Sequence, residues 1–174
     1  MVNRGTITLG SATGLSEANV GIYSKTSHAV TNTGTVTVGD NSIGVYGYSV
    51  TNSGNISTGK NGIGIYSMGG DLTLGGSISA GTDEAVGVFT KGRNQTVTST
   101  SDMSIGDKSY GYVIKGSDTV MNVHDANKLT VGNDTVYVYF FRRSSRFGGR
   151  LGAAQAVHLL DHDEDDERQN DEIE

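Results

Sequence analysis

Two stretches of the chain repeat one another, Asn32-Thr33-Gly34-Thr35-Val36-Thr37-Val38-Gly39 and Asn52-Ser53-Gly54-Asn55-Ile56-Ser57-Thr58-Gly59. A second motif follows each of them after a short turn, Ile43-Gly44-Val45-Tyr46 in one copy and Ile63-Gly64-Ile65-Tyr66 in the other. A unit that recurs at an interval of this size is typical of proteins built by stacking one small structural unit many times. The repeat therefore comes before any other feature in predicting the fold.

The same unit continues on both sides of these two copies. Clear copies begin at Asn3 and Gly76, and weaker ones contain Met103-Ser104-Ile105-Gly106 and Leu129-Thr130-Val131-Gly132. A third apolar segment precedes each following copy. Its apolar residues are Val30, Val50, Leu72, Val97 and Val123. We therefore expect about six copies, each with three short strands.

The apolar residues alternate with polar ones along each expected strand. Ile7 and Leu9 form one such pair, and Val36 and Val38 form another. A strand with only two inward side chains cannot bury its apolar face alone, but stacked copies place aliphatic residues on top of one another. The sequence predicts an all-β fold, a right-handed parallel β-helix (β-solenoid) of about six coils, over residues 1–140.

A glycine and an aromatic residue recur at fixed places in the second motif. The glycines, Gly21, Gly44, Gly64, Gly87 and Gly111, predict either a positive φ or a close approach of stacked backbones. The aromatic residues Tyr23, Tyr46, Tyr66 and Phe89 predict a ladder of rings on one face, which Val113 interrupts. Such a ladder either stabilises the sheet or forms a binding face. Asn32 above Asn52 predicts a structural ladder at a turn.

Composition and charge narrow the classes of function. The chain of 174 residues has 26 glycines and no proline, cysteine or tryptophan. Without cysteine there is no disulfide, no thiolate catalysis and no cysteine-based zinc site. The formal net charge of −6 comes without clusters of Lys and Arg, so we expect no nucleic-acid partner. We expect neither a membrane span nor a signal peptide in this chain.

The tandem pattern N-x-G-x-[IV]-x-x-G followed by G-[IV]-[YF], over residues 3–139, resembles the passenger region of type V autotransporter adhesins. This resemblance implies export, outer-membrane anchoring, and display at the bacterial cell surface with a role in cell adhesion and virulence. It also implies a host-cell or bacterial surface receptor or glycan as the partner. No segment resembles the β-barrel translocator of that family, so the chain is predicted to be a fragment. We expect this fragment to act without catalysis.

Residues 141–174 break the repeat and form a predicted irregular or partly helical acidic tail. Leu151 to Leu160 favours a short helix, and the run Asp161-His162-Asp163-Glu164-Asp165-Asp166-Glu167 favours solvated, disordered chain. The change of amino-acid composition at this point suggests a frameshift or read-through into unrelated sequence. Just before it, the uncharged, β-prone stretch from Val136 to Phe141 predicts end-to-end self-association.

Three other functions fit parts of the sequence less well. A polysaccharide-cleaving β-helix needs carboxylates on adjacent coils, and the expected turns instead alternate acidic with basic and neutral residues. Thr6 and Thr8 with Thr35 and Thr37 resemble the hydroxyl ladder of ice-binding solenoids, but later copies depart from it. The segment from His158 to His162 resembles an inverted zinc-protease motif with Asp in place of Glu. We therefore predict no catalytic, cofactor-binding or metal-binding residues.

Overall fold

The computed structural model describes residues 1–124, 128–141 and 146–149, the last of these as backbone alone. Within them the regular secondary structure is almost entirely β-strand, and the short 3-10 helix η1 (Leu15–Glu17) lies in one of the turns. The predicted tail helix, the acidic run and the His158–His162 motif lie outside the described residues. No helix in the described ranges has the length and hydropathy needed to cross a membrane.

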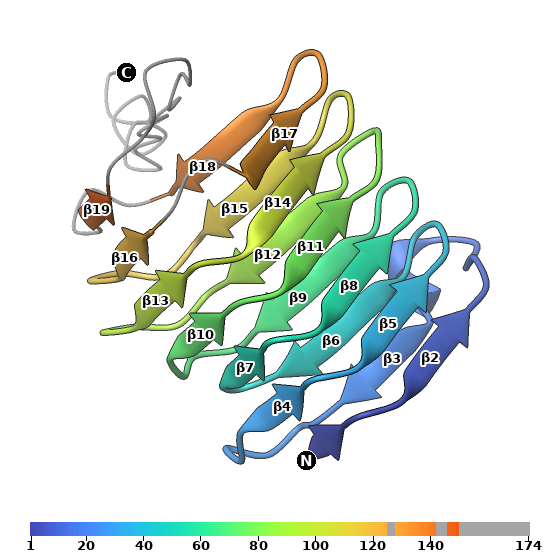
Figure 1. Cartoon of the computed structure of the whole chain (residues 1–174), viewed down its shortest axis with the longest axis horizontal. Coiled ribbons are helices and arrows are strands. Elements are labelled where there is room, and N and C mark those ends of the chain that lie inside the picture. The colour runs from blue at the N-terminus through green and yellow to red at the C-terminus, as the bar shows by residue number, and fades with distance from the viewer. Residues whose placement is uncertain (125–127, 142–145, 150–174) are drawn as a thin grey trace, which may run out of the picture.

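The strands form three parallel sheets that the chain visits in turn (Figure 1). Sheet A has seven strands among the described residues: β1 (Val2–Asn3), β4 (Val30–Asn32), β7 (Val50–Asn52), β10 (Leu72–Leu74), β13 (Thr96–Ser99), β16 (Val120–Val123) and β19 (Arg146–Gly149). Sheet B has six in the same ranges: β2 (Thr6–Leu9), β5 (Thr35–Val38), β8 (Asn55–Thr58), β11 (Ser77–Ala80), β14 (Asp102–Ile105) and β17 (Leu129–Val131). Sheet C also has six described strands: β3 (Val20–Tyr23), β6 (Ile43–Gly47), β9 (Ile63–Ser67), β12 (Val86–Thr90), β15 (Tyr110–Ile114) and β18 (Val136–Phe140).

This arrangement confirms the predicted β-solenoid. Each strand pairs in parallel with the equivalent strand of the preceding and following coil, so successive coils lie on top of one another. The parallel pairing reaches β19, which lies beside β16 and beyond the predicted solenoid boundary at residue 140. That boundary stays a prediction.

The register places like residues over like residues in a shared interior. In sheet B, Val36 pairs with Ile56, and Ile56 pairs with Ile78, all of them at most 1% exposed. The same stacking runs through sheet A, where Val50 lies between Val30 and Leu72. Each such side chain contributes about 1.5–3 kcal/mol to the free energy of folding when it is fully buried. Because the stacked coils bury these side chains against one another, the stability comes from contacts between neighbouring coils.

The recurrent glycines allow the backbones of neighbouring coils to approach closely. A Cβ atom on Gly44 would lie 2.6 Å from the carbonyl oxygen of Gly64, and one on Gly64 would lie 2.5 Å from that of Gly87. Among the described glycines only Gly76 has a positive φ, of 67°. Of the two reasons that the sequence offers for these glycines, the structure therefore supports close approach.

The predicted asparagine ladder is present inside the corner between sheets A and B. Asn3 donates from Nδ2 to Oδ1 of Asn32 at 2.8 Å, and Asn32 donates in the same way to Asn52 at 2.8 Å. Asn32 and Asn52 are both almost completely buried, at 0% and 1% exposure. Their amides also bind turn carbonyls, so the ladder fixes this corner in successive coils.

Candidate functional site

The four predicted aromatic residues form one continuous ladder on sheet C. The ring centres are 5.1 Å apart between Tyr23 and Tyr46, 4.9 Å between Tyr46 and Tyr66, and 4.8 Å between Tyr66 and Phe89, and all three pairs are stacked. The strand register aligns them, and the same register places Val113 next to Phe89. The ladder therefore spans four coils and ends at Phe89.

Stacking decides which parts of the rings meet solvent. Tyr46 and Tyr66 each have a ring on both sides, so their faces are covered and their edges and hydroxyl groups are the parts left to a ligand. Tyr23, at one end, is 52% exposed. Phe89, at the other end, is half-buried and has a valine in place of the next ring. The most exposed ring of the ladder is therefore Tyr23, whereas Phe89 is about as buried as the two central rings.

A second column of apolar residues runs along the same strands, beside the ladder. Its members are half-buried and in register: Val20, Ile43, Ile63, Val86, Tyr110 and Val136. Together with the ladder this column makes sheet C the apolar face of the solenoid. Partly exposed aromatic and aliphatic groups side by side are typical of surfaces that bind a partner.

Two aromatic residues of the last two coils behave differently from the ladder. Tyr112 and Tyr137 point into the core, with their rings edge to face at 5.6 Å between centres. The hydroxyl of Tyr112 makes a 2.7 Å hydrogen bond with Ser99 Oγ. Burial raises the pKa of Tyr112 well above its ordinary value, and burial raises the pKa of Tyr137 to about 12. Sequence periodicity did not single out either of them as a core residue.

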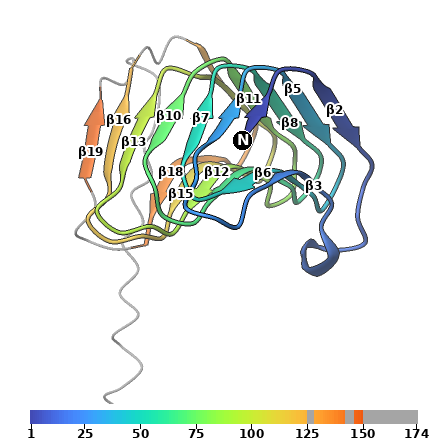
Figure 2. The same ribbon diagram turned by 90° about the horizontal axis from the view of Figure 1, so that it is seen from below.

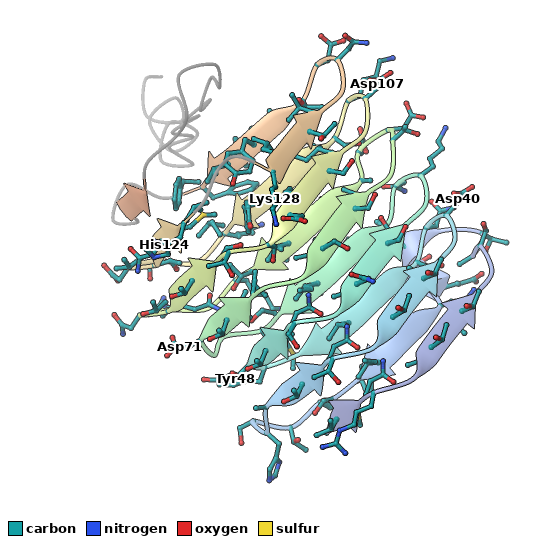
Figure 3. All side chains as sticks on the ribbon, in the orientation of Figure 1. Asp40, Tyr48, Asp71, Asp107, His124 and Lys128 are labelled. Carbon is teal, nitrogen blue, oxygen red and sulfur yellow. The ribbon has the colours of Figure 1, made fainter. Side chains whose placement is uncertain are left out.

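The edges of sheet C are two corners of opposite charge. We call B–C corner the turns that lead from sheet B to sheet C, residues 10–19, 39–42, 59–62, 81–85, 106–109 and 132–135. We call C–A corner the turns that lead from sheet C to sheet A, residues 24–29, 48–49, 68–71, 91–95 and 115–119. Figure 3 shows Asp40 and Asp107 along the first edge and Tyr48 and Asp71 along the opposite one. The apolar face lies between these corners.

The B–C corner is acidic. It carries Glu17, Asp40, Asp83, Glu84, Asp107 and Asp134 against Lys60 and Lys108. A shallow groove of about 460 Å³ lies along it, lined by residues that include Asp83, Glu84 and Asp134. Lys60 Nζ is 3.3 Å from Asp83 Oδ2, and the two side chains are 61% and 45% exposed.

Backbone conformation explains the acidic and amide residues of that corner. Asn41, Asn61, Asp83 and Asp134 all have φ between 49° and 53°, a left-handed conformation that Asn and Asp adopt more readily than other side chains. The Asp40 and Asp107 carboxylates accept hydrogen bonds from backbone amides of the next coil, at 2.8 and 2.7 Å. These contacts give the corner a role in turn formation, and they supply no buried pair of carboxylates for glycoside hydrolysis.

The C–A corner is basic. It carries Lys25, Lys91, Arg93 and Lys115 against Asp71 and Asp118, together with His28. A groove of about 420 Å³ lies where this corner meets the end of the ladder, and Tyr66, Phe89, Lys91, Arg93 and Lys115 line it with the backbone of the 115–117 turn. Sequence reasoning missed this groove because the two turns that form it, 91–95 and 115–119, differ in length and composition from the C–A turns of the earlier coils. The recurrence of Lys91-Gly92 and Lys115-Gly116 was a signal for it.

The outer face of sheet B carries hydroxyl groups in register. One column runs without interruption from β2 to β17: Thr8, Thr37, Ser57, Ser79, Ser104 and Thr130. The neighbouring column begins with Thr6 and Thr35 but continues with Asn55, Ser77 and Asp102. Lys128 Nζ is 3.4 Å from Asp102 Oδ1, so this column ends in an ion pair and not in hydroxyl groups.

Within the described residues, no group of three or more His, Asp or Glu side chains is placed to hold a metal ion. Comparison of the chain with models of protein families, with curated proteins and with solved structures finds no match.

Proposed function

We propose that this chain is a structural and adhesive segment of a bacterial surface protein of the autotransporter passenger type, and that it binds its partner through sheet C without catalysis. In this function the solenoid holds a row of side chains at fixed spacing along its axis. The partner is a receptor or a glycan at the surface of a host or bacterial cell. The aromatic and aliphatic columns of sheet C are the observation on which the proposal depends.

The chemistry of the three faces supports sheet C as the binding face. The outward positions of sheets A and B are mostly hydroxyl-bearing residues, such as Thr51 and Thr73 in sheet A and Thr37 and Ser57 in sheet B. Sheet C instead presents half-buried rings and branched aliphatic side chains. Removal of such groups from water favours binding, and Tyr is enriched at the centres of protein interfaces.

Rigidity also supports a role in binding. Each strand of β6, β9 and β12 is hydrogen-bonded on both edges, so the ladder residues of the middle coils are held in place before any partner arrives. A surface that is already ordered loses little conformational entropy on binding.

The test compares two double variants in the same two coils. Tyr46→Thr with Tyr66→Thr removes two ladder rings while β-branched residues remain on the strands, and Thr37→Ala with Ser57→Ala changes the outer face of sheet B. Beads coated with each purified protein are allowed to bind cultured epithelial cells and an array of neutral and acidic glycans. We expect the tyrosine variant to lose binding and the sheet B variant to retain it. Equal binding by the wild type and the tyrosine variant, with both folded by circular dichroism, would overturn the proposal.

The hydroxyl column of sheet B favours a second candidate, a face that orders water or ice. Regular spacing of Thr and Ser from Thr8 to Thr130 supports it, whereas the Lys128–Asp102 pair in the next column disrupts a flat hydroxyl array. Thermal hysteresis of the purified protein that disappears in the Thr37→Ala, Ser57→Ala variant would support this candidate in place of adhesion.

A further inference from the structure

The groove at the C–A corner has a charge arrangement that the fold itself does not require. The backbone amide of Lys91 donates to the carbonyl of Ser67 in the preceding coil, and that of Lys115 donates to the carbonyl of Thr90. Because Thr90 pairs with Ile114, Lys91 and Lys115 occupy the same place in adjacent coils. Like charges in adjacent strands or turns repel one another and destabilise the stack.

Neither of the two ion pairs seen in the described part of the chain involves these cations. The ion pairs there join Lys60 to Asp83 and Lys128 to Asp102. Of the acidic residues in the C–A corner, Asp71 accepts a 2.7 Å hydrogen bond from the amide of Thr96 through Oδ1, and Asp118 has an interaction of its own. Lys91, Arg93 and Lys115 are all exposed, so their charges are available to a ligand.

The two lysines fold back over aromatic rings, one of them on sheet C and the other just after its last described strand. Lys91 Nζ is 5.5 Å from the centre of the Tyr66 ring, and Lys115 Nζ is 5.3 Å from that of Phe141. These contacts hold the ammonium groups beside the apolar face. The ladder ends at this point, since Val113 follows Phe89, and Phe89, the last ring, lines the groove.

We infer that this groove binds the carboxylate or sulfate groups of an acidic polysaccharide, with Lys91, Arg93 and Lys115 as the anion-binding residues and Phe89 as an apolar contact for the sugar ring. The inference rests on the proposed adhesive function and names the class of its ligand. A guanidinium beside two ammonium groups matches anionic oxygens, and the adjacent ring offers the apolar surface that one face of a sugar presents.

A long polyanion has one favourable path on this molecule. The acidic B–C corner repels it from the other edge of sheet C, so the chain of sugars is held to the C–A side of the ladder. Opposite charge on the two corners thus gives binding a direction as well as a site. The small number of cations favours a saccharide with spaced charges over a nucleic acid, which is recognised by broader basic patches.

The test uses heparin as the sulfated probe, polygalacturonate as the carboxylated probe, dextran as the neutral probe and single-stranded DNA as the nucleic-acid probe. Isothermal titration calorimetry is carried out on the full chain and on two double variants. Lys91→Gln with Lys115→Gln removes the stacked charges of the groove. Lys60→Gln with Lys108→Gln makes the same change of net charge in the B–C corner and serves as the matched control.

We expect heparin or polygalacturonate to bind the wild type with an affinity that falls as salt is added, and dextran and DNA to bind far more weakly. Loss of each groove lysine should weaken binding by about tenfold, and the B–C control should bind as the wild type does. A Lys115→Arg variant, which retains the charge, should keep most of the affinity.

The inference would be overturned by no binding of either acidic polysaccharide, by equal loss in the control variant, or by DNA bound more tightly than both polysaccharides. Cell adhesion separates this inference from the proposed function. If Tyr46→Thr with Tyr66→Thr abolishes adhesion while Lys91→Gln with Lys115→Gln leaves both adhesion and polyanion binding unchanged, the adhesive function stands and the acidic-polysaccharide site is wrong.

Discussion

Replacement of Asn52 by alanine tests whether buried hydrogen bonds, in addition to aliphatic packing, hold successive coils together. The Asn52 side chain accepts from Asn32 Nδ2 at 2.8 Å and donates to the carbonyls of Gly54 at 3.0 Å and Gly75 at 2.8 Å. The substitution removes all three bonds. Gly54 O still accepts from the amide of Ser77, and Gly75 O still accepts from Ser101 Oγ.

The loss is therefore unequal among the three partners. Loss of the hydrogen bond to each of the two carbonyls, which keep another donor, lowers the stability by about 1 kcal/mol. Loss of the acceptor for the buried N–H of Asn32 lowers it by about 1–3 kcal/mol. We expect Asn52→Ala to lower the free energy of unfolding by about 4 kcal/mol. Urea unfolding followed by circular dichroism measures it, and the slope of the free energy against urea should stay unchanged.

Thr51→Ala is the matched control, because Thr51 is the next residue on β7 and is exposed on the outer face of sheet A. It should change the stability by less than about 0.5 kcal/mol. Asn52→Leu copies the residue found at the same place in the next coil, Leu74. It restores volume but still leaves Asn32 without its acceptor, so its stability should fall between those of the other two variants. If Asn52→Ala lost no more stability than Thr51→Ala, the buried ladder would have no role in holding the coils.

Three further predictions concern the backbone, the buried tyrosines and the coil ends. Gly64→Ala should lower the free energy of unfolding in urea by several kcal/mol, because its Cβ would lie 2.5 Å from a backbone oxygen. Gly10→Ala, whose Cβ would have nothing within 4 Å, should have little effect. Equal effects of the two substitutions would refute close approach as the reason for the glycines. Because burial raises the pKa of Tyr112 and Tyr137 above the ordinary value of 10.0, folding stability should be constant below that pH and fall above it, by about 1.4 kcal/mol per pH unit for each tyrosine. Urea unfolding at pH 9 and pH 11 measures this fall in stability. The Tyr112→Phe variant should show about half of the fall. Identical unfolding curves of the wild type at both pH values would contradict the prediction. The apolar strand β18 is the last described strand of sheet C, so we expect the protein to associate end to end. Sedimentation velocity should then detect larger species at higher protein concentration. A monomer at every concentration would count against this prediction.

The sequence predicts the fold well because the repeat itself encodes the contacts. Val36, Ile56 and Ile78 recur at one place in the repeat, and the only way to bury them all is to stack the coils. The same recurrence predicts the aromatic ladder, from Tyr23 to Phe89, and its interruption at Val113. Periodicity is thus sufficient for the columns of residues that recur at one place in the repeat.

Periodicity is not sufficient for what lies at the turns. The basic groove depends on Lys91, Arg93 and Lys115, which belong to turns without counterparts of the same sequence in the earlier coils and come together through the hydrogen bonds between coils. The inward position of Tyr137 was also missed, because it stands where the earlier coils have a glycine such as Gly111. In both cases the outcome depends on contacts that a pattern of single residues does not contain.

The unequal lengths of the turns have a consequence for how such a chain grows. The first turn between sheets B and C accommodates η1, which Figure 2 shows as a small excursion from the stack, while the next one needs only residues 39–42. Yet the strands that flank both turns keep the same register. Since Asn32 and Asn52 are equivalent positions, duplication of the segment 33–52 would insert one more coil whose upper and lower surfaces both fit their new neighbours. Lengthening by duplication and decoration by insertion are therefore independent events in this architecture, and neither requires the rest of the molecule to be redesigned.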